Sequence, residues 1–353
     1  MEYSSNRSEI IYSDQPEKDL GPVISRYPAD KVFVVTEERV DELWFKGSNL
    51  FQGYRKLVLP SGEESKNLDN VARVWRFLSQ SGADRKSILI NVGGGMLNDL
   101  CGFAASTFKR GIRFINVPTT LLSQVDASVG GKTGINFNGL KNEVGTFCNP
   151  EAVLISAQFL RTLDGFNMRS GFAEMIKHGL IFSPEHFDEL HDVDIAQPDL
   201  IALGEMIRHS VQVKEHFVMN DPKENDIRKA LNFGHTIGHA IESMAMSQGR
   251  PVLHGYAVAW GMVSELFLSE KLCGFPSQYL KNTSEWIIRM YGTIGIEKHD
   301  YDTMLEFMQH DKKNENNRIN FTLLKDVGQF EINRHCDQEL VFASLDYLNG
   351  FLS

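Results

Sequence analysis

Short runs of apolar residues recur at regular intervals through the first half of the chain. They cover residues 31–36 (KVFVVT), 54–60 (YRKLVLP), 87–95 (SILINVGGG), 113–120 (RFINVPTT) and 152–156 (AVLIS). Longer segments with helical patterns lie between some of them. Strands that alternate with helices in this way are typical of a parallel sheet with crossover helices. The pattern therefore predicts an α/β domain with a Rossmann-like parallel sheet.

One of the intervening segments carries a clear helical signal. Val71, Val74, Trp75 and Leu78 recur at the spacing of one helix face, and Gly82 ends the pattern. We expect a helix here that buries this face.

The pattern changes after residue 162, where strand signals largely stop. Helical periodicity runs through residues 169–182, 199–218, 230–245 and 255–272. We therefore expect the second half to be an all-helical domain.

The change from one pattern to the other falls at residues 162–166, where TLDGF offers turn residues but no long linker. We place the two domains at residues 1–164 and 165–353. The stretch RINFTLLKDVG, residues 318–328, is one late exception that fits a short strand pair.

Composition narrows the classes of function. The chain has 353 residues with 36 Lys and Arg against 46 Asp and Glu, a net charge of -10. This balance disfavours non-specific binding to nucleic acid or to an anionic membrane. No run of about 20 apolar residues follows the polar start, so we expect a cytoplasmic protein. The cysteines, Cys101, Cys148, Cys273 and Cys336, form no CxxC pair, which disfavours disulfides and a thiolate zinc site.

The third apolar run ends in the glycine triplet Gly93-Gly94-Gly95 and is followed by a helix-compatible stretch. Glycines at such a turn let backbone amides and a helix N-terminus approach a pyrophosphate. A tight strand-to-helix turn is the simpler interpretation. Asp99, just inside the helix, suits hydrogen bonding to hydroxyls of a ligand, or it stabilises the first turn.

The end of the next run, Pro118-Thr119-Thr120, falls at the sheet edge where parallel sheets bind ligands. The segment from Asp126 to Thr133, with Lys132, and the later pair Lys141-Asn142 concentrate Gly and Lys in an acidic protein. We interpret them as an anion site. A Walker nucleotide loop is disfavoured because the first glycine of its pattern is missing.

The helical half carries a candidate metal site. Glu174 and Lys177 are three residues apart on one predicted helix, and His235 and His239 are four apart on another. His254 opens the next predicted helix. One Glu and two His would form a zinc site with an open fourth position, whereas such histidines are also commonly buried and hydrogen-bonded. The zincin motif is absent because HTIGH lacks the adjacent Glu.

Taken together, these segments resemble the 3-dehydroquinate synthase family of sugar phosphate cyclases, from about Thr36 to Lys313. The matching segments follow the family's order: GGGMLNDLCGFAASTFKRG, VPTTLLSQVDASVGGKTGIN, LKNEVGTF, FLRTLD, GFAEMIKHGLI, RKALNFGHTIGHAIE and LHG. The resemblance implies an NAD-binding α/β domain, a helical zinc domain and a homodimer.

The resemblance also assigns residues. The implied zinc ligands, with cobalt or another divalent metal as alternatives, are Glu174, His235 and His254. The implied NAD-binding positions are Glu37, Glu63, Lys66, Gly94, Gly95, Asp99, Thr119, Thr120, Asp126, Lys132, Lys141, Phe159 and Thr162. The implied substrate and catalytic positions are Arg110, Asp126, Lys132, Asn142, Lys177, Lys214, Arg228, Asn232, His239 and Lys312. Many of the last set are cations, which suits a substrate with a carboxylate and a phosphate.

The implied reaction closes a phosphorylated seven-carbon sugar acid into 3-dehydroquinate. NAD oxidises a secondary alcohol, phosphate is eliminated, the ketone is reduced again, and an intramolecular aldol step closes the ring. Zinc is expected to polarise hydroxyl oxygens, and the lysines to stabilise phosphate and enolate charge. NAD is regenerated in each turnover.

Several positions depart from the family pattern. Asn98 stands where the glycine motif typically has Gly, GLKN replaces LGKN, and TEERV replaces an Asp-containing adenosine contact near Glu37. Lys312 and Lys313 are adjacent, and either fits the last catalytic position. If one helix extends from Arg228 through Asn232 to His235, these side chains project to one side.

Three alternatives remain beside this assignment. They are another sugar phosphate cyclase whose substrate lacks the carboxylate, a metal-dependent polyol or glycerol phosphate dehydrogenase, and a binding protein without turnover. Arg228, Asn232, Lys177 and His239 favour the carboxylate-bearing substrate. A dehydrogenase would release NADH, which distinguishes it from a cyclase.

Overall fold

The computed structural model describes residues 7–46, 51–138, 140–309 and 319–352. The chain separates into two compact units. The first comprises residues up to Asp164 together with Asp199–Val211, and the second comprises Gly165–Pro198 and the chain from Gln212 onward.

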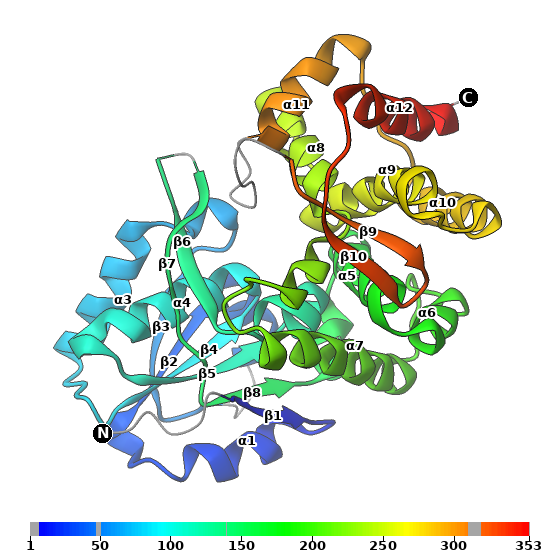
Figure 1. The fold of residues 1–353 in the computed structure, drawn as a ribbon. Helices are drawn as coiled ribbons and strands as arrows, with labels where there is room; N and C mark the ends of the chain where they lie inside the picture. Colours follow the sequence, from blue (N-terminus) through cyan, green and yellow to red (C-terminus); the bar gives the residue numbers. More distant parts are fainter. Residues whose placement is uncertain (1–6, 47–50, 139, 310–318, 353) are drawn as a thin grey trace. The chain divides into compact units, whose positions relative to one another are not determined.

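The first unit is built on a parallel sheet of six strands in the order β1-β8-β5-β4-β2-β3 (Figure 1). The strands are β1 (Glu9–Tyr12), β2 (Val32–Glu37), β3 (Arg55–Leu59), β4 (Ile88–Gly93), β5 (Arg113–Pro118) and β8 (Ala152–Ile155). Its helices are α1 (Pro16–Ile24), the short α2 (Glu38–Val40), α3 (Leu68–Gln80) and α4 (Gly95–Thr107). The predicted α/β domain with a parallel sheet is confirmed, while β1 carries no signal that we recognised in the sequence.

Alternation along the strands produces a core on each face of the sheet. Phe33 and Leu89 pack with α3 and α4 on one face, and Val34 and Ile90 pack with α1 on the other. Because successive side chains of a strand point to opposite faces, a continuous apolar run suits a sheet covered on both sides. The predicted helix corresponds to α3, which begins after Asn67, whose side chain accepts a hydrogen bond from the Asn70 amide at 3.0 Å.

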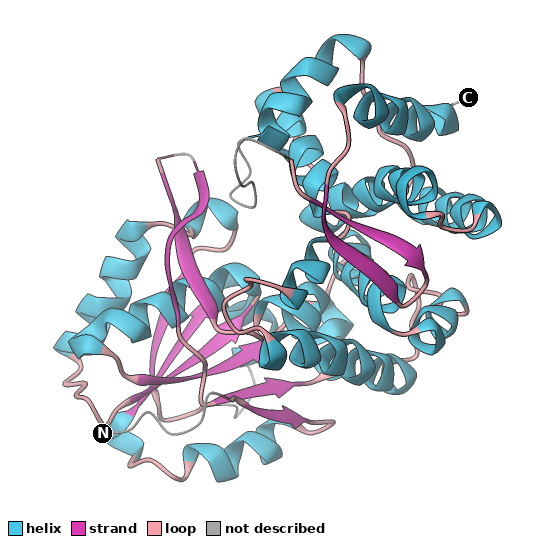
Figure 2. Cartoon of the chain, in the orientation of Figure 1, coloured by secondary structure: helices cyan, strands magenta, loops and turns pink. Residues whose placement is uncertain are grey.

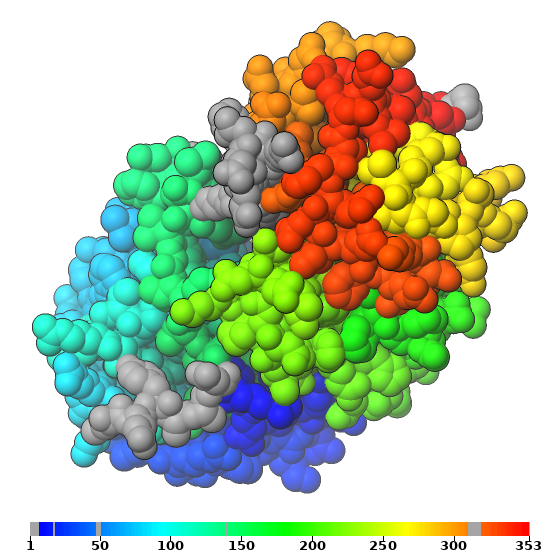
Figure 3. Space-filling view, in the orientation of Figure 1, coloured from blue at the N-terminus to red at the C-terminus, as the bar shows by residue number. Residues whose placement is uncertain are grey.

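An antiparallel hairpin formed by β6 (Lys132–Phe137) and β7 (Leu140–Phe147) occupies the segment that the sequence presented as a Gly- and Lys-rich loop. Gly134 and Gly145 face each other, and a Cβ on Gly134 would lie 2.7 Å from the carbonyl oxygen of Val144. The glycines therefore serve close strand pairing here. Most of β7 is exposed, and the space-filling view shows this part of the surface in green (Figure 3).

The second unit is helical, as predicted, and contains an antiparallel strand pair (Figure 2). The first strand lies within the stretch predicted to form a strand pair, and the second follows this stretch at residues 329–334. Its helices are α5 (Gly165–Phe182), α6 (Pro184–His191), the end of α7 (Leu200–Asn220), α8 (His235–Ser247), α9 (His254–Cys273), α10 (Ser277–Tyr291), α11 (Tyr301–Gln309) and α12 (Gln338–Asn349). The antiparallel pair is β9 (Phe321–Asp326) and β10 (Gln329–Arg334). Among the described residues, no helix is both long and apolar enough to cross a membrane.

Glycines allow α8 and α9 to pack closely. A Cβ on Gly261 would lie 2.0 Å from the carbonyl oxygen of Gly234, and a Cβ on Gly238 would lie 2.9 Å from that of Ala257. Gly234 itself has a φ of 78°, a left-handed conformation that disfavours other residues. This close approach fixes the start of α8 against α9.

Candidate cofactor and metal sites

The glycine triplet forms the turn between β4 and α4 in the first unit. The amide of Gly94 donates a hydrogen bond to Glu37 Oε1 at 2.9 Å. A Cβ on Gly93 would lie 2.6 Å from the Leu97 side chain, and one on Gly94 would lie 3.3 Å from the methyl group of Thr120. The small residues thus bring together the carboxyl ends of β2, β4 and β5, with a backbone amide that already binds an oxyanion.

A buried lysine lies beside this turn. Lys66 is 4% exposed, and its Nζ donates to Asp99 Oδ2 and to Asn142 Oδ1, each at 2.5 Å. Burial raises the pKa of Asp99. The positive charge of Lys66 acts in the opposite direction, but the effect of burial is larger. The negative charges of Glu63 and Asp126 raise the pKa of Asp99 further, so both carboxylates lie within electrostatic range.

The β6–β7 hairpin is fastened to the same region by polar contacts. The amide of Asn136 donates to the carbonyl of Lys66 at 2.8 Å, and its side chain donates to Glu63 Oε1 at 2.9 Å. Asn136 Oδ1 accepts from the amide of Asn142 at 2.9 Å. Asn142 has a φ of 53°, which suits Asn better than most residues. The altered GLKN order is therefore accommodated with Asn142 directed at Lys66.

Other predicted cofactor residues serve local structure. Thr120 Oγ1 donates to the Ser123 hydroxyl at 2.9 Å, and Thr119 is buried. Trp44 donates through Nε1 to Thr162 Oγ1 at 3.0 Å and packs against the ring of Phe159, with 5.0 Å between ring centroids.

The remaining positions of the first unit are less closely grouped. Lys132 is an exposed residue at the start of β6, and Lys141 is an exposed residue of β7. Arg110 lies beyond the C-terminal end of α4, at the opposite end of this helix from the glycine turn, with a φ of 68°. The structure of one chain therefore does not bring Arg110 to Lys66 and Asp99.

One predicted catalytic position from the second half of the chain, Lys312, lies outside the described residues.

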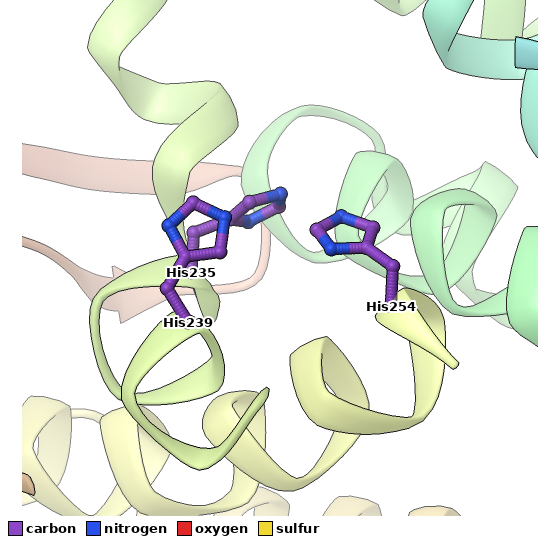
Figure 4. A group of neighbouring side chains, drawn as sticks. All are labelled: His235, His239 and His254. Carbon is purple, nitrogen blue, oxygen red and sulfur yellow. The ribbon is translucent and has the colours of Figure 1, made fainter. Parts of the chain in front are cut away.

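The second unit brings three histidines together (Figure 4). One ring nitrogen from each of His235, His239 and His254 lies within 4.8 Å of those of the other two. His235 and His239 come from the first turns of α8, and His254 is the first residue of α9. Glu174, fully buried on α5, reaches the same point: its Oε1 lies 3.5 Å from His235 Nε2 and 3.6 Å from His254 Nε2.

These separations suit a metal ion. Two ligands bound at zinc distances of roughly 2.0–2.1 Å and tetrahedral angles are separated by about 3.4 Å. The distances from Glu174 Oε1 to His235 Nε2 and to His254 Nε2 are close to that value. One carboxylate oxygen and imidazole nitrogens also form the donor set that zinc prefers in catalytic sites. The residues present therefore fit a zinc ion.

Charged partners surround the cluster. Lys177, 1% exposed, forms an ion pair with Glu174 Oε2. His254 Nδ1 lies 3.2 Å from Glu242 Oε2, and His235 Nδ1 lies 3.1 Å from the carbonyl oxygen of Phe233. Burial lowers the pKa of His254, but hydrogen bonding to Glu174 and Glu242 outweighs it and raises the pKa to about 9.

A second group of predicted residues lies just before α8. Arg228 is 1% exposed and donates through a guanidinium nitrogen to the carbonyl of Pro222 at 2.8 Å. Asn232 donates to Glu224 Oε1 at 2.9 Å. Lys214 is buried on α7.

The expectation that one helix runs from Arg228 to His235 is wrong. Ile227–Asn232 form a 3₁₀ helix, Phe233 is non-helical, and Gly234 is left-handed before α8 begins. Gly234 interrupts the helix because its amide is hydrogen-bonded to Glu265 of α9 and its carbonyl faces Gly261. A helical projection therefore does not describe how Arg228 and Asn232 lie relative to His235.

Sequence reasoning missed several polar residues around the site. Glu242 follows His235 and His239 at positions i+7 and i+3, so the helical period alone would have placed it on their face. Glu224 and Glu265 carry no comparable signal. Glu224 lies 8 residues from its partner Asn232, and Glu265 lies 31 and 28 residues from its partners Gly234 and Ile237.

Comparisons with known proteins agree along nearly the whole chain. Residues 56–170 match the family model described as 3-dehydroquinate synthase N-terminal, and residues 171–314 match the corresponding C-terminal model. A 3-dehydroquinate synthase of Parabacteroides distasonis is 48% identical over 345 residues, covering 97% of this chain and 98% of the relative.

Solved structures share the fold. A 2-epi-5-epi-valiolone synthase from Streptomyces hygroscopicus subsp. jinggangensis, with NAD+ and Zn2+ bound, matches with a TM-score of 0.87 and 24% identity over 98% of both chains. A 2-deoxy-scyllo-inosose synthase, complexed with carbaglucose-6-phosphate, NAD+ and Co2+, matches with a TM-score of 0.82 and 23% identity over 95% of both chains.

Proposed function

The chain belongs to the 3-dehydroquinate synthase family, and from this membership we propose that it converts 3-deoxy-D-arabino-heptulosonate 7-phosphate into 3-dehydroquinate and phosphate. This is a phosphate-eliminating carbon–oxygen lyase reaction of the shikimate pathway, which leads to the aromatic amino acids. The structural observation that carries the proposal is the convergence of Glu174, His235 and His254 beside the buried cation Lys177.

We propose Glu174, His235 and His254 as the zinc ligands and His239 as a substrate contact. The nearly equal distances from Glu174 Oε1 to His235 and His254 support these two histidines as ligands. The role of His239 as a substrate contact follows from the family resemblance. When bound, zinc would supply a Lewis acid that polarises hydroxyl oxygens of the substrate. Lys177, held against Glu174 without access to bulk water, contributes a fixed positive charge that favours oxyanions in the reaction.

We propose that NAD binds to the first unit, at the turn formed by Gly94 and Gly95. NAD would supply the hydride acceptor that is restored within each turnover. The amide of Gly94 holds the carboxylate of Glu37, and Lys66 holds the carboxylate of Asp99. Both carboxylates are thereby positioned to accept hydrogen bonds from cofactor hydroxyls. The other residues that the family resemblance assigns to NAD and substrate keep those roles as proposals, Arg110 and Lys312 included.

We also propose residues 1–164 as the NAD-binding domain and residues 165–353 as the zinc and substrate domain. The division of the compact units at Asp164 and Gly165 supports this boundary, although Asp199–Val211 packs with the first unit. A cytoplasmic homodimer is the assembly that we propose from the family resemblance. Sedimentation of the purified protein tests the dimer.

One assay tests the proposed reaction. Purified protein with the heptulosonate phosphate, NAD and zinc should release phosphate and 3-dehydroquinate in equal amounts. Absorbance at the NADH band should not rise in the steady state, since the hydride returns to the product. Stoichiometric NADH would indicate a dehydrogenase, and the absence of turnover would indicate a binding protein.

Recognition of the substrate carboxylate needs a separate test. We propose that Arg228 binds it, because a buried guanidinium presents a planar fork that matches a carboxylate. Arg228→Lys keeps the charge and loses the fork, so activity should fall sharply while zinc content persists. If activity toward a carboxylate-free analogue falls equally, Arg228 does not recognise the carboxylate.

A further inference from the structure

The two ring nitrogens of His254 face two different carboxylates. Nε2 lies 3.6 Å from Glu174 Oε1, the oxygen that also lies 3.5 Å from His235 Nε2, and Nδ1 lies 3.2 Å from Glu242 Oε2. A neutral imidazole carries its proton on one nitrogen and its lone pair on the other. For His254 to bind a metal beside Glu174, the proton must lie on Nδ1, and Glu242 is the acceptor placed there.

His235 achieves the same orientation in another way. Its Nδ1 lies 3.1 Å from the backbone carbonyl of Phe233, two residues earlier in the chain. A backbone carbonyl accepts a hydrogen bond but carries no net charge, and no side-chain substitution removes it. The two proposed ligands therefore differ: the orientation of His235 is fixed by the backbone, and that of His254 by a side chain.

His254 has particular need of such a partner. Its side chain is 31% exposed, compared with 11% for His235. The backbone at this point is held by the amide of Gly255, which donates to Ser170 Oγ of α5 at 3.0 Å. That contact fixes the start of α9 near the helix that carries Glu174. The orientation of the imidazole ring depends instead on the partners of its two nitrogens.

We propose that Glu242 is a positioning residue that orients His254 for metal binding. Its carboxylate accepts the Nδ1 proton, which leaves the Nε2 lone pair directed toward Glu174 and makes the imidazole a stronger donor. Glu242 is buried and lies on the face of α8 that also carries His235 and His239. One helix face therefore supplies a metal ligand, a substrate contact and the carboxylate that orients the ligand from α9.

The test measures zinc affinity directly, by competition with a chromophoric chelator, in full-length Glu242→Ala and Glu242→Gln proteins. Loss of a hydrogen-bond partner of this kind typically weakens metal binding about 10–100-fold, which is the expectation for Glu242→Ala. Glu242→Gln should lose less, because its amide oxygen still accepts the Nδ1 proton. Glu306→Ala, an exposed glutamate on α11, is the matched control and should bind zinc like the parental protein.

Cobalt-loaded proteins distinguish positioning from direct ligation. At saturating Co2+, the visible spectra of both Glu242 variants should keep the parental band pattern, whereas His254→Ala should change it by losing a nitrogen ligand. Thermal unfolding of the metal-free proteins reports any general loss of stability, and Glu242→Gln preserves side-chain volume should the alanine variant fold poorly.

Three results would overturn the proposal. Zinc affinities of the Glu242 variants within twofold of the parental value would remove any positioning role. A spectral change equal to that of His254→Ala would make Glu242 a ligand. An equal loss of zinc affinity in the alanine and glutamine variants would show that the effect does not depend on acceptance of the Nδ1 proton. The proposal rests on the proposed zinc site, and a parental protein that binds no zinc would instead contradict the site itself.

Discussion

The carboxylate of Glu265 in α9 accepts a hydrogen bond from the backbone amide of Gly234, with 2.7 Å between the two atoms. Its second oxygen accepts from the amide of Ile237 at 3.1 Å. These amides flank His235 at the start of α8, where backbone donors lack partners within the helix. A fully buried negative charge from another helix therefore stabilises the helix end that carries the proposed metal ligand.

We predict that Glu265→Ala lowers the free energy of unfolding by at least about 2 kcal/mol, because it leaves two buried amides without an acceptor. Glu265→Gln should also be destabilising, since its amide group replaces one acceptor with a donor. Urea unfolding measures both changes. Glu285→Gln, on the exposed side of α10, should change stability by less than about 0.5 kcal/mol. A similarly small effect at Glu265 would contradict this account.

Gly261 provides a second test of how α8 and α9 meet. Its replacement by Ala would place a Cβ 2.0 Å from the carbonyl oxygen of Gly234, so the helices must separate. We expect a loss of about 1–3 kcal/mol and weaker zinc binding. Gly204→Ala in α7 is the control, because its Cβ would meet the nearest atom at 3.8 Å. This change should be neutral or stabilising by up to about 1 kcal/mol.

The zinc content of alanine variants distinguishes the roles of the three histidines. His235→Ala and His254→Ala should each lose bound zinc after dialysis, because each removes a proposed ligand. His239→Ala should retain zinc and lose turnover. Metal analysis and the phosphate-release assay on the same samples make the distinction. Loss of zinc from His239→Ala as complete as from the other two would assign His239 to the metal.

Asp221 links the stability of the segment before α8 to pH. Its carboxylate accepts from the amides of Asn225 at 3.0 Å, Asp226 at 2.7 Å and Arg228 at 3.2 Å. Burial alone would raise the pKa of Asp221, but these three donors outweigh it and lower the pKa. Because the folded pKa lies below the unfolded value of about 3.9, this stabilisation is present above about pH 4. It is lost as the pH falls through the folded pKa.

We therefore predict that Asp221→Asn lowers the free energy of unfolding at pH 7 by about 1–3 kcal/mol. The difference from the parental protein should shrink as the pH falls below 4, where the carboxylate becomes protonated. Urea unfolding at pH 7 and in acid measures this. A difference independent of pH would show that the ionised form of Asp221 is not what stabilises the segment.

The sequence by itself determined the parts of this protein that depend on neighbours along the chain. Five apolar runs predicted β2, β3, β4, β5 and β8, because strands covered on both faces need continuous apolar residues. The spacing of His235 and His239 placed both on one face of α8, since four residues make about one helical turn. The glycine triplet predicted the turn from β4 to α4, because it directly follows an apolar run and precedes a helix-compatible stretch.

Only the tertiary structure decided how distant parts meet. Glu174, His235 and His254 lie on three helices, and their convergence depends on packing between those helices rather than on the periodicity within any one. The break at Gly234 arises because Glu265 and Gly261, about 30 residues later, bind and contact this turn. A local pattern cannot predict such a break. The residues around Gly234 are compatible with a continuous helix, and the break depends on the buried carboxylate that α9 places beside the Gly234 amide.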